Sequence, residues 1–160
     1  MAVGLSAKVH KKDVDMKVSD GVNLRGTYFS EGRPGPAMLL LHQCNMDRHA
    51  WDGLAEDLAS NRFNVLSIDY RGFGESGGEK FTDPAQRRAA MQKWPGDVDA
   101  AYAYLTSQKG VDQSRIAVGG ASCGVTQSSD PPPRWPDPVW APTAAIATTA
   151  GDPWAPLTPT

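Results

Sequence analysis

The sequence predicts an α/β protein in which a β-hairpin precedes a β–α–β–α–β unit with a mixed, mostly parallel sheet. Three observations indicate this class. Residues 13–19 alternate strictly between polar and apolar side chains, the run 37–41 is apolar on both faces, and two later stretches carry apolar residues at helical spacing. Alternation is typical of a half-buried strand, whereas a fully apolar run is typical of a parallel strand covered on both sides.

The first half of the chain gives four elements. Residues 13–19 and 22–30 are the two arms of a hairpin joined by Ser19-Asp20-Gly21, and residues 37–41 are the first parallel strand. The next helix is capped by Asp47, and its apolar residues at positions i, i+3, i+4 and i+7 are Trp51, Leu54, Ala55 and Leu58.

The second half repeats the strand–helix order. Residues 63–70 form a buried strand, a helix through Met91 begins at Asp83-Pro84, and Pro95-Gly96 interrupts it. The following helix ends at Gly110, and residues 116–119 form the last strand. The core stripe of that second helix consists of Val98, Ala101, Tyr102 and Leu105.

Composition divides the chain into an N-terminal arm (1–12), a partial α/β domain (13–126) and a tail (127–160). Nine of the 13 prolines lie in the tail, and such a density forbids helices and central strands, so we expect it to be disordered.

The overall composition excludes several classes. A net charge of −2 gives no basic footprint, so we expect no nucleic-acid partner. No apolar run is long enough to span a bilayer and no export signal is recognisable, which predicts a cytoplasmic protein with no membrane contact and leaves open an exported longer form. We also expect no metal and no cofactor, because no ligand cluster is evident. The oligomeric state stays open.

The segment 115–124 carries the most chemistry. It runs from a buried strand into Gly120-Ala121-Ser122-Cys123-Gly124, a spacing typical of a nucleophile elbow. Small residues must flank the central position, because the sharp turn holds that residue in a strained backbone conformation.

Three loops at the ends of the predicted parallel strands, residues 42–45, 69–76 and 120–124, together resemble the N-terminal half of the α/β-hydrolase family, particularly its dienelactone-hydrolase-like and serine-aminopeptidase-like branches. The resemblance covers residues 13–126. It implies the N-terminal part of an α/β-hydrolase fold and a serine hydrolase of small acyl substrates, acting on a carboxylic ester, lactone or peptide.

By the same resemblance Ser122 is the nucleophile, and the backbone N–H groups of Cys44 and Cys123 form the oxyanion hole. Cys123 is the alternative nucleophile, but that register places the β-branched Val125 at a position that must be small. If both amides face one oxygen, the two cysteines are neighbours, and a disulfide is conceivable. The alternative is that they are two unrelated buried side chains.

The remaining family positions have structural roles by this resemblance. Gly120 and Gly124 shape the elbow, and Asp69 and Arg71 anchor the second loop. His42 binds loop backbone, and Gln43 stands where the family usually has a glycine, so this loop departs from the family pattern.

The triad is incomplete in this sequence. The family order is nucleophile, acid, histidine, but after Ser122 the chain has three aspartates among prolines and no histidine. We therefore expect the chain to be inactive alone and to be truncated after the elbow, for which a reading-frame change near residue 126 is a hypothesis.

Other functions compete with the hydrolase. A non-catalytic hydrolase-like binding domain, or an inert truncated product, fits the missing histidine. The spacing Gly72-x-Gly74-x-x-Gly77 matches a dinucleotide-binding pattern but is not followed by a predicted helix, as that pattern requires. A recognition role for Pro131-Pro132-Pro133 in a polyproline II conformation is a further alternative.

Overall fold

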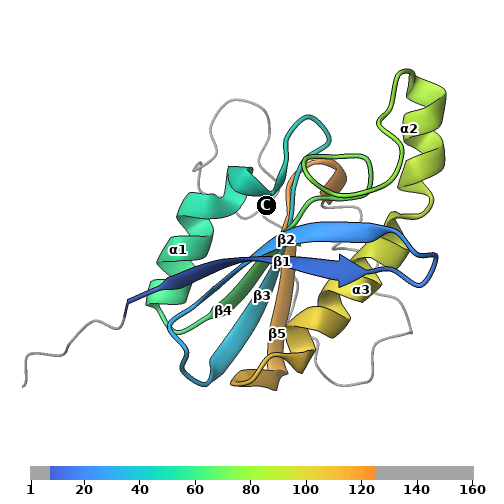
Figure 1. Ribbon diagram of the computed structural model, residues 1–160. Helices are drawn as coiled ribbons and strands as arrows, with labels where there is room; N and C mark the ends of the chain where they lie inside the picture. The colour runs from blue at the N-terminus through green and yellow to red at the C-terminus, as the bar shows by residue number, and fades with distance from the viewer. Residues whose placement is uncertain (1–7, 125–160) are drawn as a thin grey trace, which may run out of the picture.

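The computed structural model describes residues 8–124, in which a five-stranded mixed sheet lies between helices (Figure 1). The strands are β1 (His10–Lys17), β2 (Asn23–Ser30), β3 (Gly35–Leu41), β4 (Asn64–Ile68) and β5 (Val111–Gly120). Their spatial order is β1-β2-β4-β3-β5, with β2 antiparallel to both β1 and β4 and β3 parallel to both β4 and β5. The predicted fold class, a hairpin followed by a mostly parallel sheet, is confirmed.

The helices cover both faces of the sheet. A short 3-10 helix, η1 (Arg48–Trp51), leads into α1 (Asp52–Ser60), and α3 (Trp94–Ser107) lies on the opposite face from α1, while α2 (Pro84–Met91) extends beyond the end of the sheet (Figure 1). Asp47 caps η1 as predicted, since its carboxylate accepts a hydrogen bond from the His49 N–H. None of these helices meets the length and apolarity that a bilayer crossing demands.

Several boundaries differ from the prediction for physical reasons. β1 begins at His10 rather than at residue 13, because its pairing with β2 extends from His10 opposite Ser30 to Lys17 opposite Asn23. Pro95 does not interrupt a helix but lies in the first turn of α3, where a missing N–H costs nothing. The tail that we predicted to be disordered lies outside the described residues.

Two hydrophobic layers account for the apolar run in β3. Leu39 and Leu41 face α3 and pack in a cluster with Val98 and Leu105, whereas the alternate residues of β3 pack on the other face against α1. Because successive side chains of a strand point to opposite faces, a strand buried on both sides must be apolar at every position.

The register of the parallel strands determines where the loops begin. Leu41, the last residue of β3, is paired with Ile68 at the end of β4 and with Gly120 at the end of β5. The three loops predicted to carry function therefore begin side by side at the carboxyl ends of the parallel strands. This is where open α/β sheets bind ligands.

A buried ion pair fixes the second of these loops to α3. The Arg71 guanidinium donates to Asp97 Oδ1 from Nε at 2.9 Å and from Nη2 at 2.6 Å, and the Arg71 N–H donates to Asp97 Oδ2 at 3.0 Å. Asp97 is fully buried, and this burial raises its pKa, while the hydrogen bonds and charge of Arg71 oppose the rise.

Replacing Asp97 by Asn tests this pair. The Asp97→Asn substitution removes the buried counter-ion of Arg71 and leaves only the partly exposed Asp20 carboxylate, 2.6 Å from Arg71 Nη1. We therefore expect the free energy of unfolding in urea denaturation to fall by about 3 kcal/mol, the lower end of the range for breaking a buried pair. The control is Lys11→Gln, which removes an exposed ion pair with Asp52 and should change stability by less than about 1 kcal/mol. Equal losses in both variants would contradict the assignment.

Candidate active site

Ser122 lies in a sharp turn directly after β5. Its φ is 53°, in the left-handed region that residues with a side chain rarely adopt, and its side chain is exposed. The turn is tied to β3 and to itself, because the Ala121 N–H donates to Leu41 O at 3.4 Å and the Gly124 N–H donates to Ala121 O at 2.9 Å. An exposed hydroxyl on a strained turn at the end of a strand matches the geometry expected of an elbow.

The two glycines of the turn are required by close packing. A Cβ on Gly120 would lie 2.7 Å from the carbonyl carbon of Gly124 and 2.9 Å from Leu41 O. A Cβ on Gly124 would meet the carbonyl oxygens of Leu41 and His42, the latter at 3.0 Å. The backbone after β5 therefore approaches the end of β3 more closely than any side chain permits.

The loop after β3 begins with a buried histidine. The Tyr70 N–H donates to His42 Nε2 at 3.2 Å, so the ring proton belongs on Nδ1, which lies 2.7 Å from the Gln43 carbonyl oxygen. Both ring nitrogens are therefore occupied by backbone groups. Burial is the main cause that lowers the pKa of His42, which keeps the ring neutral at pH 7.

Cys44 and Cys123 form a disulfide whose Cα atoms are 5.8 Å apart. The expected contact between the two cysteines is confirmed, and it joins the loop after β3 to the residue that follows Ser122. Within the described residues, neither the Cys44 N–H nor the Cys123 N–H donates a hydrogen bond to a protein acceptor. Two amide donors that have no acceptor within residues 8–124 thus belong to disulfide-bonded residues at the carboxyl end of the sheet.

The loop after β4 is held by a buried charge cluster. Asp69 accepts hydrogen bonds from the Arg48 N–H at 2.7 Å, from Arg48 Nη1 at 2.5 Å and from the Glu75 N–H at 3.0 Å. Arg48 also contacts the Glu75 carboxylate and donates to Thr27 Oγ1 at 2.9 Å. These bonds, with the ion pair of Arg71, fix the backbone of the loop.

Sequence reasoning missed Arg48. Its side chain is 1% exposed, although an arginine next to a helix cap is ordinarily solvated. The carboxylate of Asp69, at the end of a predicted buried strand, was the available signal, since a buried carboxylate requires a cationic partner.

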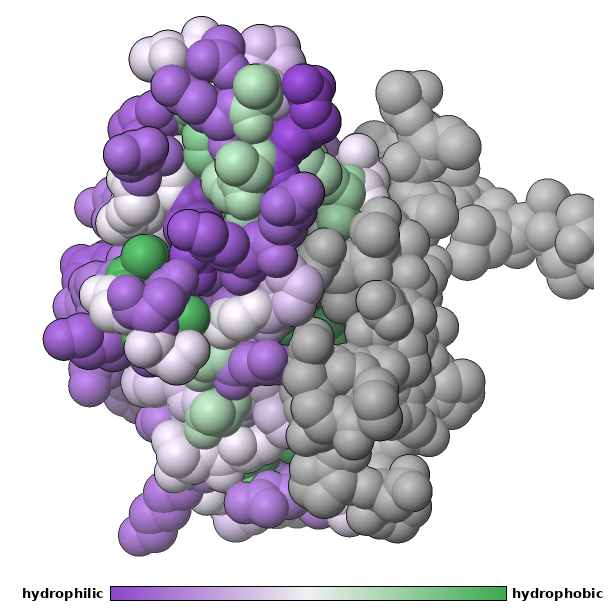
Figure 2. Space-filling view, turned by 90° about the vertical axis from the view of Figure 1, so that its right-hand side faces the viewer, coloured by the Kyte–Doolittle hydropathy of each residue, from purple (hydrophilic) through white to green (hydrophobic). Residues whose placement is uncertain are grey.

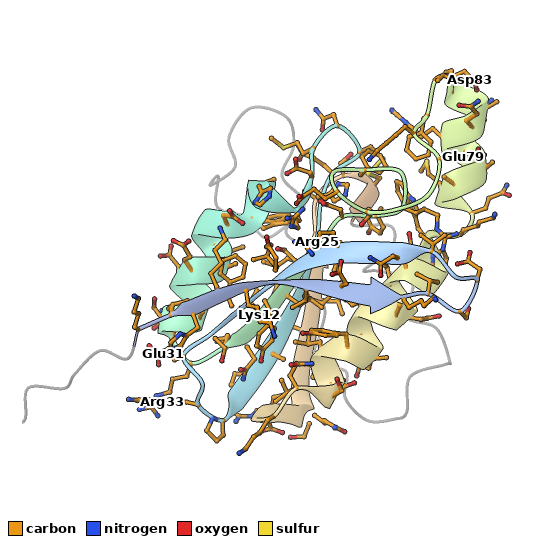
Figure 3. The ribbon with its side chains drawn as sticks, in the orientation of Figure 1. Lys12, Arg25, Glu31, Arg33, Glu79 and Asp83 are labelled. Atoms are coloured by element: carbon orange, nitrogen blue, oxygen red, sulfur yellow. A yellow bond between two sulfur atoms is a disulfide. The ribbon has the colours of Figure 1, made fainter. Side chains whose placement is uncertain are left out.

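A cavity of about 600 Å³ opens beside Cys44. Its wall is apolar at Phe73, Phe81 and Met91, and Arg87 and Arg88 of α2 also line it. Asp83 lies at the end of α2 farthest from the sheet (Figure 3), and its carboxylate accepts hydrogen bonds from the Ala85 and Gln86 N–H groups. The outer surface over α2 is mostly hydrophilic with scattered apolar residues (Figure 2).

The other candidate site residues and motifs from the sequence do not form a site in the structure. His49 is exposed on η1 and contacts Asp52 at 3.1 Å. Residues 71–83, which hold the dinucleotide-like glycines, form a loop that reaches α2 only at Pro84, so no helix begins inside that motif. No group of three metal-ligating side chains is found in residues 8–124.

The elbow glycines give one prediction. Gly120→Ala should destabilise the protein by about 1–3 kcal/mol, because the backbone of Gly124 and Leu41 must shift to admit the methyl group. Gly53→Ala is the matched control: its Cβ would meet nothing within 4 Å on α1, and we expect a gain of about 0.4–1 kcal/mol. Urea denaturation measures both, and a neutral Gly120→Ala would contradict the close approach.

The buried neutral state of His42 gives a second prediction. Because its folded pKa lies below the unfolded value of about 6.5, the unfolded chain binds the extra proton first, and stability falls as the pH drops below about 6.5. His42→Gln should flatten this dependence in unfolding curves recorded between pH 7.5 and 5.5. His49→Gln should retain it, and an unchanged slope in His42→Gln would refute the explanation.

Comparison with known proteins agrees with this geometry. The family model for the alpha/beta hydrolase fold matches residues 36–129. An uncharacterized protein from Mycobacterium tuberculosis is 36% identical over 115 residues, which cover 71% of this chain and 38% of the relative. A thiohydrolase from Aspergillus aculeatus is 30% identical over 115 residues, covering 69% of this chain and 33% of the relative.

Solved structures agree as well. An esterase from Pyrococcus furiosus aligns with a TM-score of 0.60 and 28% identity over 74% of this chain and 45% of that chain. An acetyl xylan esterase from Paenibacillus sp. R4 aligns with a TM-score of 0.63 and 26% identity over 79% and 45%. The chain spans between 33% and 45% of the length of these relatives. The sheet order, the level loops and the matched family model together show that this chain belongs to the alpha/beta hydrolase fold family.

Proposed function

We propose that the protein is a serine hydrolase of small acyl substrates (carboxylic esters, lactones or peptides) and that Ser122 is its nucleophile. The observation that supports this most is the exposed serine in a left-handed turn, one residue from an amide that has no acceptor in the described chain. Two of the structural relatives are named esterases and one sequence relative is named a thiohydrolase.

In this proposal the Ser122 Oγ attacks the substrate carbonyl carbon, and the carbonyl oxygen gains negative charge. The N–H groups of Cys44 and Cys123 meet that charge, which they can do without first breaking another hydrogen bond. The tetrahedral intermediate then expels the leaving group and forms an acyl-serine, which water hydrolyses. The cavity beside Cys44 is the proposed site for the acyl group, since its wall is apolar.

The attack requires a base for the hydroxyl proton. The chain has three histidines, all before Ser122. His42 has both ring nitrogens occupied, so it cannot accept the proton without losing a backbone hydrogen bond. His10 begins β1, and His49 is held at Asp52. The acid and histidine that the family places after the nucleophile thus have no counterpart among residues 8–124.

The two occupied ring nitrogens of His42 favour a second candidate, a non-catalytic binding domain that retains the hydrolase site. The two candidates differ in the reactivity of Ser122. A binding domain presents an ordinary hydroxyl, whereas a hydrolase site presents one that reacts faster once a base is supplied.

A fluorophosphonate probe tests the proposal on the full chain. We expect slow labelling at Ser122, accelerated about 10-fold or more by added imidazole, which replaces the missing base in solution. Because loss of the base typically costs several orders of magnitude, labelling without imidazole should be weak. Mass spectrometry of the labelled peptide identifies the residue.

The controls are Ser122→Ala, which should abolish labelling, and Ser60→Ala, which removes a serine hydroxyl on α1 and should leave it unchanged. Labelling that persists in Ser122→Ala, or that imidazole does not accelerate, would exclude the nucleophile and favour the binding domain.

A further inference from the structure

We propose that the Cys44–Cys123 pair is a reversible redox modification site that switches the oxyanion hole, with the disulfide as the competent form and the dithiol as the impaired form. The proposal rests on the proposed function, because it assigns a regulator to the same site. It starts from the position of the bond, which joins the two residues whose amides are the proposed oxyanion donors.

The disulfide is the main tie between the loop after β3 and the elbow. The hydrogen bonds of residues 43–46 are local: the Met46 N–H donates to Gln43 O at 3.1 Å, and Gln43 Nε2 donates to Met46 Sδ at 2.8 Å. Within the described chain, Cys44 and Asn45 donate no hydrogen bond to another element, and Met46 is 47% exposed. Both cysteines pack against the core cluster, but among residues 8–124 no backbone hydrogen bond other than the local ones fixes the Cys44 N–H relative to the Cys123 N–H, so the covalent bond is what holds the two amides together.

The bond is also reachable from solution. Cys44 lines the cavity of about 600 Å³, so a small thiol that enters there comes into contact with Cys44. Arg87 and Arg88 line the same cavity and make no ion pair with any carboxylate of residues 8–124. Asp83 also lines the cavity, but its carboxylate accepts the capping hydrogen bonds of α2, and two arginines against one aspartate leave a net positive lining. The cavity therefore favours thiols that carry carboxylates over neutral ones.

The chemistry is a two-electron thiol–disulfide exchange. In reduction, an incoming thiolate attacks Cys44 Sγ, the Cys44–Cys123 bond breaks, and Cys123 leaves as a thiolate that takes up a proton. A second thiolate then attacks the mixed disulfide at the small-molecule sulfur. Cys44 leaves as a thiolate and takes up a proton. The two small thiols, which supplied the two electrons, leave joined as a low-molecular-weight disulfide. Oxidation by such a disulfide reverses both steps and yields two small thiols.

The mixed disulfide on Cys44 places its small-molecule part inside the cavity that we assign to the acyl group. The site is then closed in two ways, since the cavity is filled and the two amides are no longer held together. Restoring the Cys44–Cys123 bond removes both obstacles.

The first test does not depend on activity. The full chain is equilibrated with glutathione disulfide or with dithiothreitol, its free thiols are alkylated and counted by intact mass, and hydrogen–deuterium exchange is followed in peptides that cover residues 42–47. We expect no free thiol in the oxidised form, two in the reduced form, and exchange about 10-fold faster in this loop after reduction. Peptides of β1 and β2 should not change.

Two variants distinguish the effect of losing the disulfide from the effect of any change in the loop. Cys44→Ser/Cys123→Ser should exchange like the reduced protein under both conditions, whereas Met46→Gln, in the same loop, should keep the redox response. Two free thiols after treatment with glutathione disulfide, or equal exchange in both forms, would overturn the proposal.

The second test measures the fluorophosphonate rate at Ser122 in both redox forms with imidazole present. We expect reduction to slow it about 10- to 100-fold, the effect of weakening one oxyanion donor. Equal rates would overturn the switch and leave the Ser122 proposal standing. No labelling in either form would overturn the proposed function and the switch with it, while the exchange data would still show whether the bond orders the loop.

Discussion

The rest of the structure depends on the pairing register that aligns the carboxyl ends of β3, β4 and β5. Leu41 pairs with Ile68 on one side and with Gly120 on the other, so three loops that are distant in sequence start from one line. A shift of one residue in either pairing would reverse the faces of a strand that is buried on both sides and would also separate the loops. The hydrophobic layers and the candidate site are therefore fixed by the same register.

Buried ion pairs fix the loop after β4 in addition to the strand register. The loop after β4 contains carboxylate and guanidinium groups with little access to solvent, and each is neutralised by a partner from a different element. Asp69 is bound by Arg48 of η1, and Arg71 is bound by Asp97 of α3. Because each pair joins the loop to a helix on a different face of the sheet, the loop connects both layers.

The sequence predicted features that depend on near neighbours and missed those that depend on distant ones. The helix beginning at Pro84 was predicted at its observed bounds, because Asp83 caps it locally. The start of β1 depends on how far β2 pairs with it, and the burial of Arg48 depends on carboxylates 21 and 27 residues away. Neither leaves a local signature. The contact of Cys44 with Cys123, 79 residues apart, was expected because the family resemblance places both amides at one oxyanion hole.

A chain of aromatic rings runs from the cavity wall into the core. Phe81 contacts Phe73 edge-on at 5.2 Å, Phe73 contacts Trp94 at 5.7 Å, and Trp94 stacks on Tyr70 at 4.3 Å. Trp94 and Tyr70 are completely buried. The shape of the cavity is thus part of the packing that stabilises the domain, and substitutions that widen it must also loosen this packing. Evolution of a broader substrate range at this wall would consume stability, so such changes would be accessible chiefly to variants that had first gained stability elsewhere.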